Sequence, residues 1–202
     1  MNKKTVALLM ACVLLVGAAI GGTMAWLVDS TGEVTNTFTV GDINITLTET
    51  GTDANGEKNY PFVPGDTLSK DPKVTVLKDS EPCWLFVKVV ENNNITVTGK
   101  NSAGEEVSEK ALKYSIADGW TQYNNTEYWY RTVDSKVTEE SGLSFDVLTN
   151  NVVNVSTFIT KDSALETAQP TITFTAAAVQ KAHIDTPADA FAQTPDSFRA
   201  SN

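Results

Sequence analysis

The sequence predicts an all-β fold: a two-sheet antiparallel sandwich of jelly-roll or immunoglobulin-like type. Short helical pieces are expected in its loops, and an N-terminal signal-peptide helix is expected before it. Three observations predict this class. Apolar and polar residues alternate with a period of two in many short segments. Clusters of Asn, Gly, Ser and Glu separate these segments at short intervals. No long segment has the periodicity of a helix.

The first 25 residues have the three parts of a signal peptide. Two lysines precede an apolar run over residues 6–20, and the small residues Thr23 and Ala25 follow it. A signal peptidase is expected to cut after Ala25, so that Trp26 becomes the first residue of the exported chain. Residues 1–25 are therefore predicted to be removed, and membrane contact is expected only through them before cleavage.

The leader has two other interpretations, a retained membrane anchor and a lipid-attachment signal. A retained membrane anchor needs roughly 17 apolar residues, which the run approaches, but three glycines interrupt the end of the run and no basic segment follows it. Cys12 follows a Leu-Met-Ala sequence that resembles a lipid-attachment motif. The apolar stretch continues well beyond Cys12, which argues against lipid attachment.

The next segment is expected to form the first strands. Residues 26–40 are predicted to be an N-terminal strand segment that either pairs with another copy or forms the first strand of its own domain. Its candidate assembly residues are Trp26, Leu27, Val28, Val34, Phe38 and Val40. Residues 41–185 are predicted to be the sandwich domain, and residues 186–202 a C-terminal tail.

The sandwich domain contains further strand patterns separated by turns. Residues 34–49 alternate in two runs, residues 50–60 form a polar loop, and residues 61–66 form a Pro- and Gly-containing turn that cannot lie inside a central strand. Later strands are expected at residues 73–78, 83–90, 95–98, 111–116, 128–133, 145–148, 152–159 and 171–181. Short helical pieces are expected near residues 161–167 and 187–192.

The charge and cysteine content exclude several classes. The formal net charge is −10, and removal of the leader makes the chain more acidic, so nucleic acid is not an expected partner. Cys83 is the one cysteine that remains after cleavage, so no intramolecular disulfide is expected. This is common in Gram-positive secreted proteins. Stability must then come from a hydrophobic core, for which the chain is long enough.

The sequence does not contain a recognisable catalytic motif, and no enzyme activity, cofactor or metal site is predicted. His183 is the one histidine, and Cys83 lies in an apolar strand where a thiol is normally inert. Residues 53–57 resemble part of a calcium loop but lack its final glutamate, and an ordinary turn explains them better. Lys88 lies in step with apolar residues, which indicates either an isopeptide bond or a strand near an edge where the lysine reaches water.

Four aromatic residues form a possible recognition surface: Trp120, Tyr123, Tyr128 and Trp129. Such side chains stack on sugars or anchor protein partners. They could equally be core, because strand alternation places Tyr128 and Trp129 on opposite faces.

Several segments resemble the TasA and camelysin family of secreted Gram-positive proteins, which are exported with a dedicated peptidase called SipW. The similar segments are residues 21–29 (GGTMAWLVD), 34–41 (VTNTFTVG), 63–66 (VPGD), 70–72 (KDP) and 173–180 (TFTAAAVQ). They lie toward both ends of the chain, and the middle is divergent.

The resemblance implies a jelly-roll subunit of an extracellular biofilm-matrix fibre, located in the matrix or at the cell surface. In this family an N-terminal strand of one subunit completes the sheet of its neighbour, so the implied partner is a second copy of the same chain. Two alternatives remain: a monomeric cell-surface module that binds a carbohydrate or protein, and a metalloprotease of the camelysin kind. The protease is disfavoured because zinc sites usually need two or three grouped ligands.

Overall fold

The structure is a computed structural model of the chain, and it describes residues 37–40, 42–51, 63–160 and 170–200. The chain divides into two compact units, residues 1–31 and 32–202, and all described residues belong to the second. The predicted signal peptide and the expected helical piece at 161–167 lie outside the described residues. The same holds for several candidate residues: Thr23, Ala25, Trp26, Leu27, Val28 and Val34.

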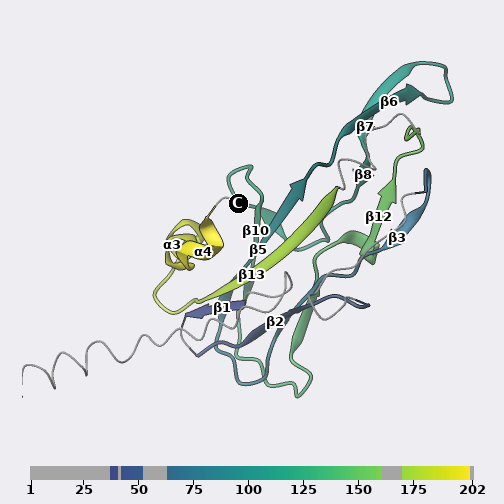
Figure 1. The fold of residues 1–202 in the computed structure, drawn as a ribbon. Coiled ribbons are helices and arrows are strands. Elements are labelled where there is room, and N and C mark those ends of the chain that lie inside the picture. Colours follow the sequence, from purple (N-terminus) through teal and green to yellow (C-terminus); the bar gives the residue numbers. More distant parts are fainter. Residues whose placement is uncertain (1–36, 41, 52–62, 161–169, 201–202) are drawn as a thin grey trace, which may run out of the picture. The chain divides into compact units, whose positions relative to one another are not determined.

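The predicted all-β class is confirmed, because the described residues form mainly strands in several sheets (Figure 1). The largest sheet has the order β1 (Thr37–Val40), β13 (Thr171–Gln180), β5 (Cys83–Asn92), β10 (Tyr128–Val133), β9 (Thr121–Gln122). One three-stranded sheet has the order β11 (Leu143–Asp146), β4 (Lys73–Val76), β2 (Ile45–Thr48). Another has the order β3 (Thr67–Ser69), β12 (Val152–Val155), β8 (Leu112–Lys113). A separate hairpin consists of β6 (Thr96–Lys100) and β7 (Glu106–Lys110).

One face of the five-stranded sheet packs on both three-stranded sheets in a single hydrophobic core. The chain passes between the two three-stranded sheets at two places, each marked by a break in the extended backbone. Pro72, which has no N–H to donate, separates β3 from β4, and the short 3-10 turn η1 (Thr149–Asn151) separates β11 from β12. Asn150 and Asn151 have positive φ angles of 56°, which end the extended conformation.

The other face of the five-stranded sheet is covered by two helices, α3 (Pro187–Gln193) and α4 (Asp196–Arg199). Their Ala190, Phe191 and Phe198 form a second apolar cluster with Trp84 and Phe86 of β5. Figure 1 shows α3 and α4 on one side of β5 and β13, and β2, β12 and β3 on the other. The expectation of a C-terminal tail over 186–202 is therefore wrong for residues 187–199, which pack on the domain; a helical piece near 187–192 is confirmed.

β5 is apolar on both sides because both faces of its sheet are covered. It lies between β13 and β10, so Lys88 of β5 is in a central strand and not near an edge. All strand pairs in the described residues are antiparallel except β1 with β13, which run parallel. No hairpin joins β1 to β13, so turn geometry does not force these two strands to be antiparallel.

Other expected strands have different limits in the structure. The pattern over 34–49 includes two strands in different sheets, β1 and β2, and the pattern over 111–116 includes only the two-residue strand β8 and a bridge between Ile116 and Leu148. The described part of the expected turn over 61–66 is confirmed, because the Asp66 N–H donates to the Val63 carbonyl and Gly65 has a φ of 85°. β3, β7 and β9 lie outside all the predicted strands.

Candidate assembly edge

β1 is the described part of the predicted assembly segment, and it forms one edge of the five-stranded sheet. Phe38 lies opposite Ala177 and Val40 opposite Val179 in the parallel pair with β13. β1 also contacts β2 of the facing sheet. The structure therefore places β1 on a lateral side of the sandwich, in contact with both layers, where it pairs with its own chain.

β1 covers only part of β13. It pairs with residues Ala176 to Val179, whereas β13 has ten residues. The first five residues, from Thr171 to Thr175, pair with β5 on one side, and no described strand pairs with them on the other. In the described part of the chain, this half of β13 is an edge that can accept main-chain hydrogen bonds from another strand.

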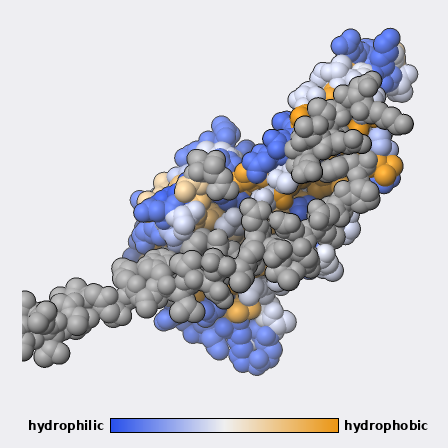
Figure 2. Space-filling model, viewed as in Figure 1, coloured by the Kyte–Doolittle hydropathy of each residue, from blue (hydrophilic) through white to orange (hydrophobic). Residues whose placement is uncertain are grey.

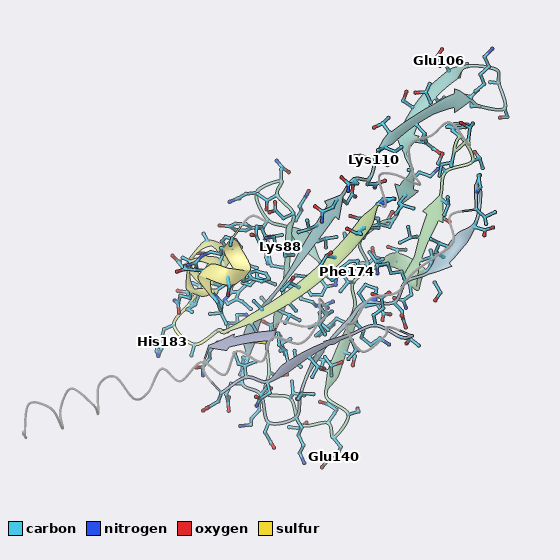
Figure 3. The ribbon with its side chains drawn as sticks, viewed as in Figure 1. Lys88, Glu106, Lys110, Glu140, Phe174 and His183 are labelled. Carbon is cyan, nitrogen blue, oxygen red and sulfur yellow. The ribbon has the colours of Figure 1, made fainter. Side chains whose placement is uncertain are left out.

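The interior behind this edge is closed by an ion pair. Lys70 and Glu49 lie 2.9 Å apart, with side chains only 14% and 8% exposed, and the Lys70 ammonium lies 5.3 Å from the centre of the Phe174 ring. Phe174 is in the middle of β13 (Figure 3). The pair shields the core on this side, while no described strand pairs with the outer side of residues 171–175 of β13. Sequence reasoning missed Glu49, because its partner is 21 residues away and no local pattern connects them.

The predicted recognition residues do not form one surface. Trp120 is 8% exposed and belongs to the main core, against which Trp129 also packs. Tyr128 is 6% exposed and belongs to the cluster under α3 and α4, where Tyr123 stacks on Phe191 with ring centres 4.5 Å apart. The face shown in Figure 2 is mainly hydrophilic in its described part, with hydrophobic residues scattered or in small groups.

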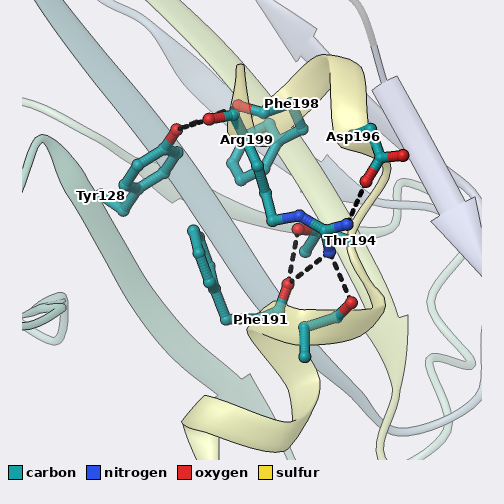
Figure 4. Close-up of polar contacts among 7 residues, drawn as sticks. Tyr128, Phe191, Thr194, Asp196, Phe198 and Arg199 are labelled. Carbon is teal, nitrogen blue, oxygen red and sulfur yellow. Dashed lines mark hydrogen bonds and ion pairs between the residues drawn. The ribbon is translucent and has the colours of Figure 1, made fainter. Parts of the chain in front are cut away.

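Polar side chains on the sheet hold the C-terminal helices in place. The Tyr128 hydroxyl donates to the carbonyls of Phe198 and Arg199, at 3.2 and 3.0 Å, and the Arg199 guanidinium bonds to carbonyls of α3 (Figure 4). The Trp84 indole N–H donates to the Ile184 carbonyl at 3.0 Å. These hydrogen bonds to main-chain carbonyls add to the side-chain packing of Phe191 and Phe198 on the sheet.

Lys88 belongs to the same group of contacts. It is 5% exposed, its ammonium donates to the Ala200 carbonyl, and it lies 5.5 Å from the centre of the Tyr128 ring. The expectation that this lysine reaches water at an edge is therefore wrong. A buried ammonium beside the last carbonyls of α4 is favoured by the partial negative charge at a helix C-terminus.

The structure describes both reactive side chains that the sequence singles out, Cys83 and His183. Burial raises the pKa of the Cys83 thiol to about 12, so it is protonated near neutral pH. His183 is exposed and has a φ of 63°. Across the described ranges, no group of three or more His, Cys, Asp or Glu side chains is placed to hold a metal ion.

Burial also raises the pKa values of Tyr114 and Tyr128.

Among the described residues, no helix is long and apolar enough to cross a membrane.

Comparisons with protein-family models, curated proteins and solved structures gave no match to this chain.

Proposed function

We propose that the protein is a secreted subunit of an extracellular matrix that assembles by exchange of its N-terminal strand with the next copy. The signal peptide over residues 1–25 directs its export, and the sandwich is of jelly-roll or immunoglobulin-like type. Its partner is a second copy of the same chain, in the matrix or at the cell surface. Its role is structural rather than enzymatic.

One observation carries this proposal: β1 is a four-residue parallel edge strand that leaves half of β13 unpaired among the described residues. A short edge strand is held by few main-chain hydrogen bonds. Exchange of the same strand between identical copies keeps those bonds, so the cost in free energy is small.

The register of β1 defines where an incoming strand would lie. Thr37 is opposite Ala176, and the two strands run in the same direction. The same register, continued toward the N-terminus of a donor strand, sets its residues 32–36 against residues 171–175 of the receiving copy, with Val34 opposite Thr173. The sequence over 34–38 (VTNTF) has the β-branched and aromatic residues that favour a strand. An exchanged strand would then cover most of β13.

A monomeric binding module has less support. Trp120 and Tyr128 are buried, and the four aromatic residues belong to two different faces of the sheet. A metalloprotease also has less support, because no described cluster provides the grouped ligands that zinc proteolysis uses.

The test uses two cysteine variants of the chain that begins at Trp26. Val34→Cys and Thr173→Cys are purified separately, mixed under conditions that favour assembly, and oxidised. We expect a disulfide between the two variants, detected as a dimer by non-reducing gel and mass spectrometry, because paired residues of adjacent strands lie close enough to form one. Cys83 does not compete, because it is buried and its raised pKa keeps it protonated.

The matched control is Thr171→Cys, which lies on the same strand roughly 7 Å further along. It should form much less dimer with Val34→Cys. A chain carrying both Val34→Cys and Thr173→Cys tests the competing arrangement. An internal disulfide in that chain, with no dimer in the mixture of single variants, would mean that the strand stays in its own domain.

A further inference from the structure

Arg131 lies on the other lateral side of the sandwich, where β10, whose outer neighbour is the two-residue strand β9, faces β11. Arg131 is on β10, in step with Trp129 and Val133, so its side chain points between the two layers. Its guanidinium carbon lies 3.6 Å from the centre of the Phe145 ring of β11 and 5.4 Å from that of Trp120. The guanidinium therefore covers the edge of the core on this side.

The main chain is also covered on this side. The Trp120 indole N–H donates to the Asp146 carbonyl at 2.9 Å, and the Ala117 N–H donates to the Val147 carbonyl at 2.9 Å. The Thr149 N–H donates to the Ser115 carbonyl, so residues 115–120 run beside the end of β11. This leaves only a short part of the β11 edge without a described partner, in contrast to the five residues of β13.

The turn before β9 is shaped to accept the guanidinium. Gly119 has a φ of 88°, and a Cβ placed on it would lie 3.2 Å from a terminal nitrogen of Arg131. Both the backbone angle and the close approach favour glycine here. Burial lowers the pKa of Arg131, and its Nε makes no hydrogen bond within the described residues. The charge is already poorly solvated in the single chain.

We propose that Arg131, with Trp120 and Gly119, is a seal that prevents a second copy from adding to the β10–β11 side of the sandwich. A strand docked here would remove the remaining water from a guanidinium that has no carboxylate partner in the described residues, and such desolvation is costly. Inward-pointing charges protect sheet edges in this way.

The inference that further copies add to one side of the sandwich rests on the proposed function. Of these two sides of the sandwich, the β13 edge would then be the one open to a second copy, because Lys70, the described cation beside it, is neutralised by Glu49. Between these two sides, each copy would then offer one accepting edge and one donor strand, which favours an unbranched chain of subunits. The seal itself does not depend on strand exchange and can be tested alone.

The test compares Arg131→Met with the unchanged protein, both beginning at Trp26 and both carrying Ser144→Cys. Ser144 is exposed on β11, and methionine keeps an unbranched apolar side chain over Phe145 while it removes the charge. We expect a rise of about tenfold in disulfide-linked dimer on oxidation, equivalent to ~1.4 kcal/mol in association free energy. The matched control is Lys100→Met, which removes an exposed charge on β6 and should change nothing.

Equal amounts of disulfide-linked dimer with and without Arg131→Met would overturn the seal. Abundant dimer in the protein that carries Ser144→Cys alone would overturn it as well. If thermal unfolding shows that Arg131→Met does not fold, Arg131→Gln decides the question by the same comparison. The readout is separate from the test of strand exchange. An increase in Ser144→Cys dimer in the Arg131→Met protein alone, without a Val34→Cys to Thr173→Cys link, would support the seal and contradict the proposed fibre.

Discussion

At the scale of single residues, buried polar side chains connect loops and helices to the sheets through main-chain groups. Asn94 is 6% exposed and bonds to both the N–H and the carbonyl of Leu112, at 2.9 and 3.0 Å. Ser80 is fully buried and bonds to the N–H and carbonyl of Asn44. Unpaired buried polar groups are costly, so each such side chain fixes a segment in one position.

Tyr128 is the residue where this effect is most easily measured. Tyr128→Phe removes the hydroxyl that donates to the Phe198 and Arg199 carbonyls and keeps the ring that packs on Phe198. We expect the free energy of unfolding to fall by about 1–2 kcal/mol, because the carbonyls lose their partner in a buried place. Denaturant unfolding followed by fluorescence measures it.

Tyr123→Phe is the control for this prediction. Tyr123 stacks on Phe191 in the same cluster, but its hydroxyl makes no hydrogen bond to a described residue. The free energy of unfolding of the Tyr123→Phe protein should be nearly unchanged. A loss as large as that of Tyr128→Phe would mean that the rings, and not the hydrogen bonds to α4, hold the helices.

At the scale of elements, turns and edges decide which strands form. The sequence does not predict β7, because its residues alternate between exposed and half-buried and none is fully buried, so apolar alternation does not mark the strand. It forms because it pairs along its length with β6, and the hairpin extends from Lys110 at its base to Glu106 near its tip (Figure 3). A Cβ placed on Gly99 of β6 would lie 2.3 Å from the Phe158 ring, so glycine at this position lets the ring pack against the hairpin.

The turn before β11 gives a second prediction. Gly142 has a φ of 71°, and a Cβ placed on it would lie 2.5 Å from the Val76 carbonyl oxygen. Gly142→Ala must therefore displace the backbone of β4 or β11, and we expect a loss of about 2–3 kcal/mol in the free energy of unfolding.

Gly104→Ala separates the two causes. Gly104 has a similar φ of 82°, but an added Cβ meets nothing within 4 Å. Its cost should be about 1 kcal/mol, from the left-handed backbone alone. Equal losses for the two variants in denaturant unfolding would contradict the close contact with Val76.

At the scale of the whole molecule, the core contains groups whose neutral forms are favoured. Burial raises the pKa of the Cys83 thiol from 9.0 to about 12, and burial raises the pKa values of Tyr114 and Tyr128 above 10.0. In the unfolded chain these groups ionise at their ordinary pKa values. Stability from a raised pKa is fully present below the unfolded value and is lost as the pH rises through the folded value.

We therefore expect the free energy of unfolding to fall from about pH 9 to pH 12, with Cys83 alone contributing on the order of 3 kcal/mol at the upper end. Urea unfolding at fixed pH values across this range measures the change. Cys83→Ala should lose less stability over the same range, relative to its own value at pH 8. A constant free energy of unfolding up to pH 11 would contradict the burial of these groups.

The sequence by itself determined the all-β class and the positions of most strands, because alternation is a local pattern. β4, β5, β10 and β13 lie within one or two residues of their predicted limits. It also identified the strand segment over 26–40 as a candidate for assembly, from composition and resemblance. A local pattern contains no information about which strand pairs with which.

Only the tertiary structure decided the rest. It placed β1 parallel to β13, buried Lys88 under α4, divided the four aromatic residues between two faces, and brought Lys70 to Glu49 and Arg131 to Phe145. Each of these joins residues that are far apart in the chain. Their contacts depend on the packing of whole layers, because side chains bury only the surfaces that the completed sheets bring together.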